Sequence, residues 1–402
     1  MEQKLPVEMA TDPASIRSSN VDAFFERCGL PLETRERCWA MARGLFPGRT
    51  IDEVKSQGYC SYTLLVGQDT IVQFRPPVHR LDIRLTTAAQ EIYGSLAPRT
   101  ELLGWLETPL QPSPKKAGDG TDSQALIDEA IAIDDNDHEP GSSFHVYCMT
   151  RIPGVSLAEV LVSSSMKSPR SPTPCRLRQQ RETIVENFAD FIAVGWKSAR
   201  PASDPIVSSL CGRVGCSIRW RLEVMSAHLP RRFRSAVREA LDRLGEIESL
   251  PWALTHGDVR PANMMMMSPP QDSAGVLSVS GFLDWAEAEY LPLGTGLYGL
   301  EELLGENGVD GRFSYYMEAD DLREVFWSRL AAELPGINIQ NGTHYRDVIG
   351  AAHILGVLLW HGIAFDNGRL NRVVEEGKDD SEIWRLDIFF NQFHSEESQV
   401  QF

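Results

Sequence analysis

The sequence predicts an α+β protein with two lobes, a small β-rich N-terminal lobe and a larger, mostly helical C-terminal lobe. Short β-rich runs are concentrated before residue 151, whereas helical periodicity dominates after residue 175. The helical part is interrupted once, at 254–285, by further short apolar runs. At 402 residues the chain is long enough for two or three domains, which agrees with a division into lobes.

The N-terminal lobe is expected at 51–147, after an N-terminal extension at 1–50. In the extension, helical spacing of apolar residues predicts one or two short helices that end at Pro47-Gly48. The lobe itself contains two β-rich runs joined by a tight turn at Gln68-Asp69, which is typical of a hairpin. After the hairpin we expect a helix, a largely disordered insertion and a buried strand, in that order, at 81–96, 111–142 and 144–150.

The C-terminal lobe is expected at 154–402, after a short hinge at 148–153. A Ser- and Pro-rich stretch at 163–174 predicts an exposed loop. Apolar residues at helical spacing then predict one helix within 179–199 and another across 232–250.

The chain is acidic, with 56 Asp and Glu residues against 39 Lys and Arg residues and a formal net charge of −17. Binding to phosphate backbones needs a concentrated basic surface, so no nucleic-acid partner is expected. Seven cysteines are too few for a disulfide scaffold, and their odd number fits a reducing compartment. The first residues lack an apolar signal sequence, and the apolar stretch 351–365 is shorter than the roughly 20 residues that span a bilayer. We expect a cytoplasmic protein with no membrane partner.

The β interruption carries the residues with the clearest chemistry. His256, Asp258 and Asn263 precede the apolar run 264–267, and Asp284 ends the apolar run 279–285. If these runs pair as a hairpin, Asn263 and Asp284 come close together. Oxygen ligands from two loops suit a Mg²⁺ ion that carries nucleotide phosphates. Asp258 would face the same cavity and could accept the proton of an attacking hydroxyl.

The strings HGDVRPAN and FLDW resemble the catalytic loop and metal-binding strand end of the aminoglycoside phosphotransferase and choline kinase family, relatives of the protein kinases. The segment 361–377 resembles C-terminal segments of fungal members. The resemblance implies a bilobal protein-kinase-like fold, with Asp258 as catalytic base and Asn263 and Asp284 as metal ligands. It implies that His256 supports the loop. Gly257, where protein kinases carry arginine, favours a small-molecule phosphotransferase.

Two readings of the loop residues remain open. Arg260 lies where protein kinases carry a phosphate-contacting lysine, so it could neutralise charge on the transferred group, or it could be a solvated arginine. Asp258 and Asn263 could also be simple loop caps. The pattern His-x-Asp-x₄-Asn should occur by chance in about a few per cent of chains of this length. The apolar-apolar-Asp-aromatic end of a second strand at hairpin distance argues against coincidence.

By the same resemblance, Gly58 and Ser61 lie in the loop and strand that cover the nucleotide phosphates. Arg75 takes the position of the usual phosphate-contacting lysine. Only one glycine of the usual glycine-rich pattern is present, although the small Ser61 would still permit close backbone approach. Arginine is bulkier and forked, so Arg75 could pair with an acid instead of phosphate.

Glu91, on the helix expected at 81–96, is the candidate that orients Arg75, although it could equally be an exposed helix glutamate. The backbone of Cys148, Met149 and Thr150 is the expected contact for adenine. In this family the C-terminal lobe supplies the acceptor pocket. Acids there would suit a cationic acceptor, although each could be an ordinary surface charge: Glu287, Glu289, Asp366, Glu375, Glu376, Asp379 and Asp380.

The sequence therefore predicts a phosphotransferase that uses ATP and Mg²⁺ to phosphorylate a hydroxyl of a small molecule, such as a cationic amino alcohol or a secondary metabolite. A catalytically inactive pseudokinase that acts as a nucleotide-gated scaffold or regulator is the alternative, favoured by the single glycine and by Arg75. Protein-kinase activity is a third reading, weakened because no activation segment is recognisable after Asp284. The sequence does not indicate the acceptor, the choice between ATP and GTP, or the oligomeric state.

Overall fold

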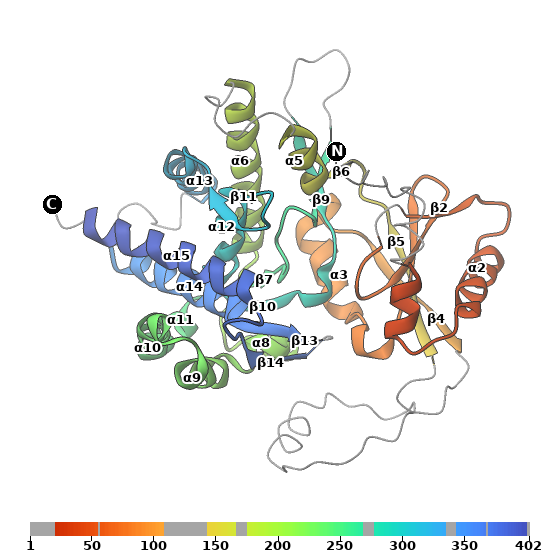
Figure 1. Ribbon diagram of the computed structural model, residues 1–402, viewed down its shortest axis with the longest axis horizontal. Coiled ribbons are helices and arrows are strands. Elements are labelled where there is room, and N and C mark those ends of the chain that lie inside the picture. Colours follow the sequence, from red (N-terminus) through yellow and green to blue (C-terminus); the bar gives the residue numbers. More distant parts are fainter. Residues whose placement is uncertain are drawn as a thin grey trace, which may run out of the picture. The chain divides into compact units, whose positions relative to one another are not determined.

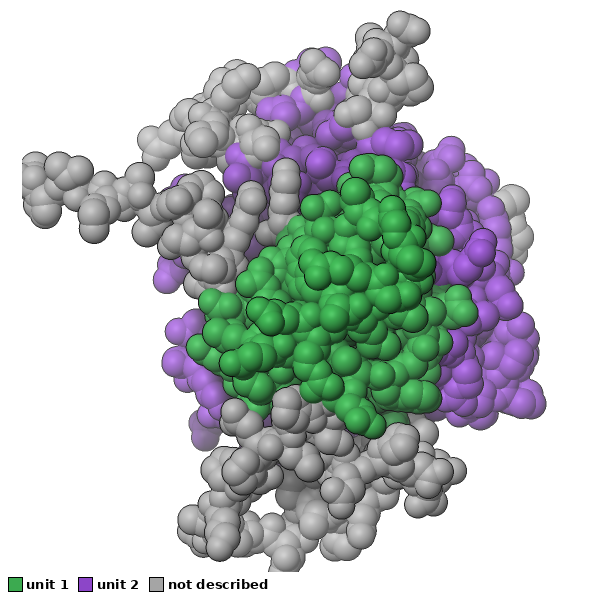
Figure 2. Space-filling model, turned by 90° about the vertical axis from the view of Figure 1, so that its right-hand side faces the viewer, with its two compact units in different colours: residues 1–80, 100–151 green, residues 81–99, 152–402 purple. Residues whose placement is uncertain are grey.

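The computed structural model describes residues 21–54, 57–107, 143–165, 175–267, 277–334, 343–366 and 369–399. The predicted insertion at 111–142 and most of the predicted loop at 163–174 lie outside these ranges. Two compact units make up the chain, and Figure 2 colours them separately. Unit 1 comprises residues 1–80 and 100–151, and unit 2 comprises residues 81–99 and 152–402. The predicted α+β class, with a β-rich first part and a mostly helical second part, is confirmed.

Unit 1 is built on a five-stranded antiparallel sheet with the strand order β1-β2-β3-β5-β4 (Figure 1). The predicted hairpin is confirmed, because β2 and β3 pair from Tyr62–Phe74 to Val66–Thr70. Gly67 begins its turn with a φ of +66°, a conformation that glycine adopts without a steric penalty. The strands are β1 (Ile51–Glu53), β2 (Tyr62–Val66), β3 (Thr70–Arg75), β4 (Thr100–Glu107) and β5 (Ser143–Thr150).

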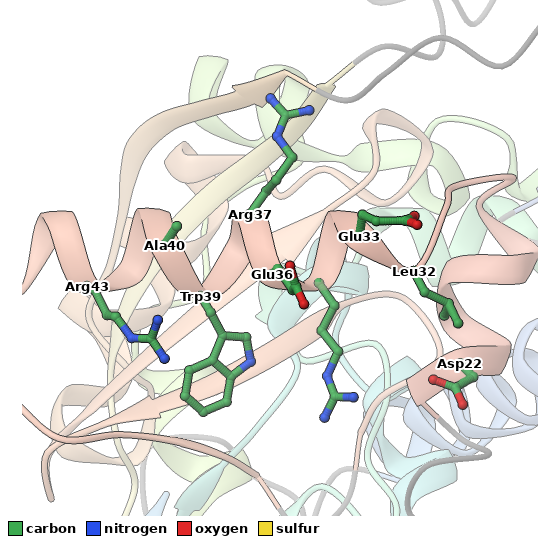
Figure 3. Close-up of a pocket in the computed structure, with 9 residues that line it drawn as sticks. Asp22, Leu32, Glu33, Glu36, Arg37, Trp39, Ala40 and Arg43 are labelled. Carbon is green, nitrogen blue, oxygen red and sulfur yellow. The ribbon is translucent and has the colours of Figure 1, made fainter.

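The two predicted N-terminal helices are present, at 21–27 and in α2 (Glu33–Leu45). Their apolar side chains share one core with the sheet, so they are an integral part of unit 1 and not a separate extension. Trp39 on α2 also donates a hydrogen bond to the Tyr62 hydroxyl at 2.8 Å. Residues of α2, together with Asp22 and Leu32, line a hollow (Figure 3) that contains three acids and three arginines: Asp22, Glu33, Glu36, Arg35, Arg37 and Arg43.

The predicted helix at 81–96 is present as α3 (Ile83–Tyr93) followed by the 3-10 turn η2 (Gly94–Leu96). We expected it in the N-terminal lobe, whereas its contacts place it in unit 2. The Tyr93 hydroxyl donates to the Leu254 carbonyl at 2.5 Å, and its ring stacks on Phe191 with centroids 4.6 Å apart. These long-range contacts, absent from any local pattern, decide the grouping.

Unit 2 is dominated by helices. The helix expected within 179–199 is confirmed as α6, whereas the one expected across 232–250 is broken at Arg243. Leu244 and Ile247, which follow the break, are both completely buried. The helices after α3 are α5 (Leu157–Ser165), α6 (Cys175–Lys197), α7 (Pro205–Leu210), α8 (Gly212–Gly215), α9 (Ile218–His228), α10 (Arg234–Asp242), α11 (Leu244–Ser249), α12 (Tyr298–Leu303), α13 (Ala319–Glu333), α14 (Thr343–His361) and α15 (Asp380–Gln399).

Short strands interrupt the helices of unit 2, and two of its small sheets frame the loop 256–263. β7 (Trp252–Thr255) pairs with β10 (Glu289–Pro292), while β6 (Val155–Ser156), β8 (Met264–Met267) and β9 (Ser278–Phe282) form the second sheet. Two further hairpins are β11 (Gly305–Asn307) with β12 (Phe313–Tyr315) and β13 (Ile363–Asp366) with β14 (Arg369–Val373). In the part of the chain that the structure describes, no helix has the length and apolar character to cross a bilayer.

Candidate active site

The loop 256–263 leaves β7 and enters β8, and the predicted hairpin with β9 is confirmed. Met264 pairs with Phe282, so Asn263 lies beside the residues that follow β9. The Leu283 amide donates to the Asn263 carbonyl at 2.8 Å. The hairpin therefore brings Asn263 next to the segment that carries Asp284, as the spacing of the two apolar runs predicts.

His256 is a buried support of the loop. Its Nε2 lies 2.8 Å from the Leu283 carbonyl, and its Nδ1 accepts a hydrogen bond from the Asp258 amide at 3.1 Å. Burial lowers the pKa of His256 to about 4, so the ring is neutral, with Nε2 protonated as donor and Nδ1 as acceptor. A neutral imidazole thus ties the loop to the end of the hairpin.

Gly257 is required by a close approach of two backbone segments. Its φ is +78°, and a Cβ atom placed there would lie 1.9 Å from the Glu287 carbonyl oxygen. No side chain fits at this position, which gives a physical reason for glycine where protein kinases carry arginine.

Asp258 is only 7% exposed and is held by its neighbours. The Asn263 Nδ2 donates to Asp258 Oδ2 at 2.6 Å and to the Asp258 carbonyl at 3.0 Å. Burial raises the pKa of Asp258 to about 7; the Arg260 charge opposes the rise, and the Asp284 charge adds to it. A carboxyl group with this pKa can exchange a proton near neutral pH, as a general base must.

Asp284 has a left-handed backbone, with φ 60° and ψ 70°. Among the described residues it is the only non-glycine residue with positive φ. Such a conformation costs roughly 1–2 kcal/mol and persists where the surrounding structure imposes it. Here the hydrogen bonds of Leu283 to Asn263 and His256 fix the backbone immediately before Asp284.

The donor set fits a magnesium ion. With its Nδ2 on Asp258, Asn263 has its amide oxygen as the atom that could ligate, and the Asp284 carboxylate could supply a second oxygen. The negative charge of Asp284 raises the pKa of Asp258, a repulsion that a nearby cation would relieve. Within the described ranges no three His, Cys, Asp or Glu side chains gather into a metal site. Two protein oxygens with phosphates and water are the set that Mg²⁺ commonly takes.

Arg260 has features of both interpretations, a solvated arginine and a residue that neutralises charge on the transferred group. Its side chain is 57% exposed, and its Nε lies 3.3 Å from Asp258 Oδ1. The guanidinium is therefore solvated and also adjacent to the candidate base.

The nucleotide-binding residues expected in unit 1 have contacts of their own. Gly58 is exposed, whereas Ser61 is buried and its hydroxyl lies 3.2 Å from the Thr63 hydroxyl. Arg75 is buried and donates to the Gln73 side chain at 2.9 Å and to the His79 carbonyl at 3.3 Å. Their contacts to phosphate stay predictions.

Glu91 and the expected adenine contact are also untested. Glu91 is exposed on α3, which belongs to unit 2, and its pairing with Arg75 stays a prediction. Cys148, Met149 and Thr150 form the end of β5, not a free connector. Cys148 and Met149 have strand partners on both sides, in β3 and β4, so Thr150 is the least enclosed of the three.

Most of the acids proposed for a cationic acceptor have structural partners. The Glu289 carboxylate accepts hydrogen bonds from three backbone amides of α8 at 2.7–2.9 Å. Arg372 binds the carboxylates of Asp366 and Asp379, each at 2.7 Å, and lies 3.4 Å from Glu375. Glu376 pairs with Arg232, and Asp380 accepts from the Gly377 amide at 2.6 Å. These contacts stabilise local structure.

Sequence reasoning missed Glu302, an almost buried residue of α12 whose negative charge raises the pKa of Asp258. Its carboxylate lies 2.8 Å from Arg385 Nε and 3.4 Å from His361 Nε2. The string around it is an ordinary helical pattern, so no local signal separates Glu302 from a surface glutamate.

No protein-family model matches the chain, and a search of curated proteins finds no match. Solved structures do show similarity. The GDP complex of wild-type aminoglycoside 2′-phosphotransferase-IIIa has 12% identity and a TM-score of 0.40, over 80% of this chain and 97% of that one. Choline kinase from Cryptosporidium parvum has 11% identity and a TM-score of 0.44, over 91% and 96%. A thermostable mutant of aminoglycoside phosphotransferase APH(4)-Ia, in a ternary complex with AMP-PNP and hygromycin B, has 13% identity and a TM-score of 0.43, over 87% and 95%.

These solved structures are of the family that the loop motif resembles. At TM-scores below 0.5 the similarity by itself supports no conclusion about what this chain binds or does. The argument for function therefore rests on the geometry of the loop and hairpin.

Gly257→Ala should disrupt the loop, because the new methyl group would overlap the Glu287 carbonyl and the φ would be strained. We expect a loss of more than 1 kcal/mol in the free energy of unfolding, measured by urea denaturation. Gly245→Ala is the control, since nothing lies within 4 Å of its added Cβ on α11. Equal effects of the two changes would contradict the steric role of Gly257.

Asp258→Asn should raise stability in a pH-dependent way. Because the pKa of Asp258 is about 7 in the folded chain and 3.8 is its ordinary value, the folded state retains a proton that the unfolded state loses. The wild-type free energy of unfolding should then fall by about 1.4 kcal/mol per pH unit between these values. Thermal melts in EDTA at pH 4.5 and 7.5 should show the variant gaining on wild type as pH rises. A pH-independent difference would contradict the raised pKa.

Proposed function

We propose that this protein is an ATP- and Mg²⁺-dependent phosphotransferase that moves the γ-phosphoryl group to a hydroxyl of a small molecule. The observation that carries the proposal is the set formed by Asp258, Asn263 and Asp284 at the junction of loop and hairpin. Asp258 is buried, has a pKa near neutrality and is oriented by Asn263. A pair of loop caps, Asp258 and Asn263, would need neither a second carboxylate nor a raised pKa.

In this proposal each residue has a defined task. Asp258 orients the acceptor hydroxyl and takes its proton as the oxygen attacks phosphorus. Asn263 and Asp284 would hold Mg²⁺, which when bound neutralises phosphate charge. His256 keeps the Asp258 amide in place, and Arg260 is close enough to the base to stabilise negative charge on the transferred group.

The proposed acceptor is a hydroxyl-bearing small molecule, with a cationic amino alcohol or a secondary metabolite as the finer suggestion. The net charge of −17 is compatible with a cationic compound. Because several candidate acids are engaged in local contacts, support for a positive charge on the acceptor is weaker than support for the phosphoryl transfer.

A pseudokinase that acts as a nucleotide-gated scaffold is the second candidate, and the contacts of Arg75 favour it. Its guanidinium donates to Gln73 and His79 within unit 1, so it has protein partners for at least two of its donors. A phosphate contact through Arg75 would compete with them. Catalysis and nucleotide binding can be tested separately.

Mg·ATP should raise the thermal-unfolding midpoint, because ligand bound only to the folded chain stabilises it. At a hundredfold excess over the dissociation constant, the gain is about 2.7 kcal/mol, or a few degrees for a chain of this size. We expect the rise to need magnesium and to be lost in Asp284→Ala. No rise at saturating Mg·ATP would contradict the proposed nucleotide site.

Asp258→Asn should lower turnover by about 10²- to 10⁴-fold, the usual contribution of a general base, with the Mg·ATP midpoint shift retained. The assay follows ADP release with a panel of small amino alcohols, neutral polyols and peptides as acceptors. Wild-type turnover in the variant would remove Asp258 from this role. A midpoint shift in wild type without ADP release from any acceptor would favour the scaffold.

A further inference from the structure

Helix α12 packs directly against the loop that carries Asp258. The Val259 side chain is 2% exposed, and a Cβ atom added to Gly299 would lie 2.6 Å from Val259 Cγ1. No side chain therefore separates α12 from the loop at this point.

A polar contact in this interface involves Tyr298, the first residue of α12. The Val259 amide donates a hydrogen bond to the Tyr298 hydroxyl at 2.8 Å, and both residues are buried. The Tyr298 ring is fixed in turn, because it stacks on Trp360 of α14 with centroids 4.6 Å apart and planes 14° apart. A buried amide without an acceptor is costly, so the hydroxyl holds Val259 in place.

The peptide between Asp258 and Val259 is thus held at both ends. Its carbonyl accepts from Asn263 Nδ2 at 3.0 Å, and its amide donates to Tyr298 at 2.8 Å. The third backbone contact is that of the Asp258 amide with His256. These contacts together determine where the Asp258 side chain begins.

We propose that Tyr298 is a positioning residue for the candidate base: by accepting the Val259 hydrogen bond it orients the peptide that carries Asp258. The inference rests on the proposed function for its effect on turnover, whereas its effect on the loop backbone can be measured without any substrate. His256 and Tyr298 then hold consecutive amides of the loop from two different elements. Both are uncharged acceptors, so neither adds a fixed charge beside Asp258.

The substitution Tyr298→Phe tests this role, because it keeps the ring that stacks on Trp360 and removes only the hydroxyl. Tyr315→Phe is the matched control: its hydroxyl donates to Glu301, which is also on α12, so this change removes a hydroxyl contact of the same helix and leaves the acceptor of the Val259 amide in place. Hydrogen exchange followed by mass spectrometry reports on the Val259 amide in the peptide that spans 254–264.

We expect Tyr298→Phe to accelerate exchange in this peptide by about ten- to a hundredfold, the range set by loss of the acceptor of one buried amide. Exchange in α6 and α13 should stay unchanged, and Tyr315→Phe should leave the loop peptide unchanged. Wild-type exchange of the loop in Tyr298→Phe would overturn the inference. Equal acceleration across the whole unit would overturn it too, because it would show general destabilisation.

The second measurement is slow hydrolysis of Mg·ATP, with water as the acceptor. Tyr298→Phe should reduce kcat by about ten- to a hundredfold and leave KM for ATP unchanged, since the residue acts on the base and not on the nucleotide. An unchanged kcat in an active enzyme would overturn the positioning role. If wild type itself is inactive, the proposed function fails, while the exchange data still decide whether Tyr298 holds the loop.

Discussion

The register of the β8–β9 hairpin is the constraint on which the candidate active site depends. Met264 and Phe282 pair in this hairpin, and both are completely buried. Because side chains alternate between the two faces of a strand, a slip of one residue would move these apolar groups toward solvent. The same slip would break the hydrogen bond between Leu283 and Asn263 and carry Asp284 away from the loop. The burial of apolar side chains in the hairpin thus fixes where Asn263 and Asp284, the two proposed metal ligands, lie relative to each other.

Burial also sets the electrostatics of the site: it lowers the pKa of His256 and raises the pKa of Asp258, and so favours the neutral form of both side chains. His256 loses its charge, and its neutral ring serves as both donor and acceptor within the backbone. The pKa of Asp258 is raised toward neutrality chiefly by burial; the Arg260 charge opposes the rise, and the Asp284 and Glu302 charges add to it. A buried carboxylate surrounded in this way lowers stability, and such arrangements are concentrated at functional sites. A divalent cation beside Asp284 would change this balance and favour the ionised base.

Local sequence patterns predicted the helices and strands. The grouping of these elements into units, and the contacts of the loop with α12, depend on residues far apart in the sequence. The hairpin and α6 follow from β-rich runs and helical spacing, and the hairpin alone was enough to bring Asn263 to Asp284. The grouping of α3 with unit 2 depends on Tyr93 and Leu254, which are 161 residues apart in the sequence. Tyr298 and Glu302 were missed for the same reason. Their string has no pattern that marks a site, and only the packing of α12 on the loop makes either residue relevant to Asp258.

The net charge of the chain is a poor guide to the acceptor, because the carboxylates near the candidate site are compensated locally. Glu302 is bound by Arg385, and Glu382 lies 2.7 Å from His361 Nδ1. Arg372 binds both Asp366 and Asp379, so these acids stabilise the β13–β14 hairpin and the segment that follows it. The net negative charge of the whole sequence is therefore no evidence that the acceptor site is negatively charged. A cationic acceptor that bound to one of these acids would have to replace its arginine or histidine partner, and the energy of that exchange would favour compounds whose donors match the geometry of the group displaced.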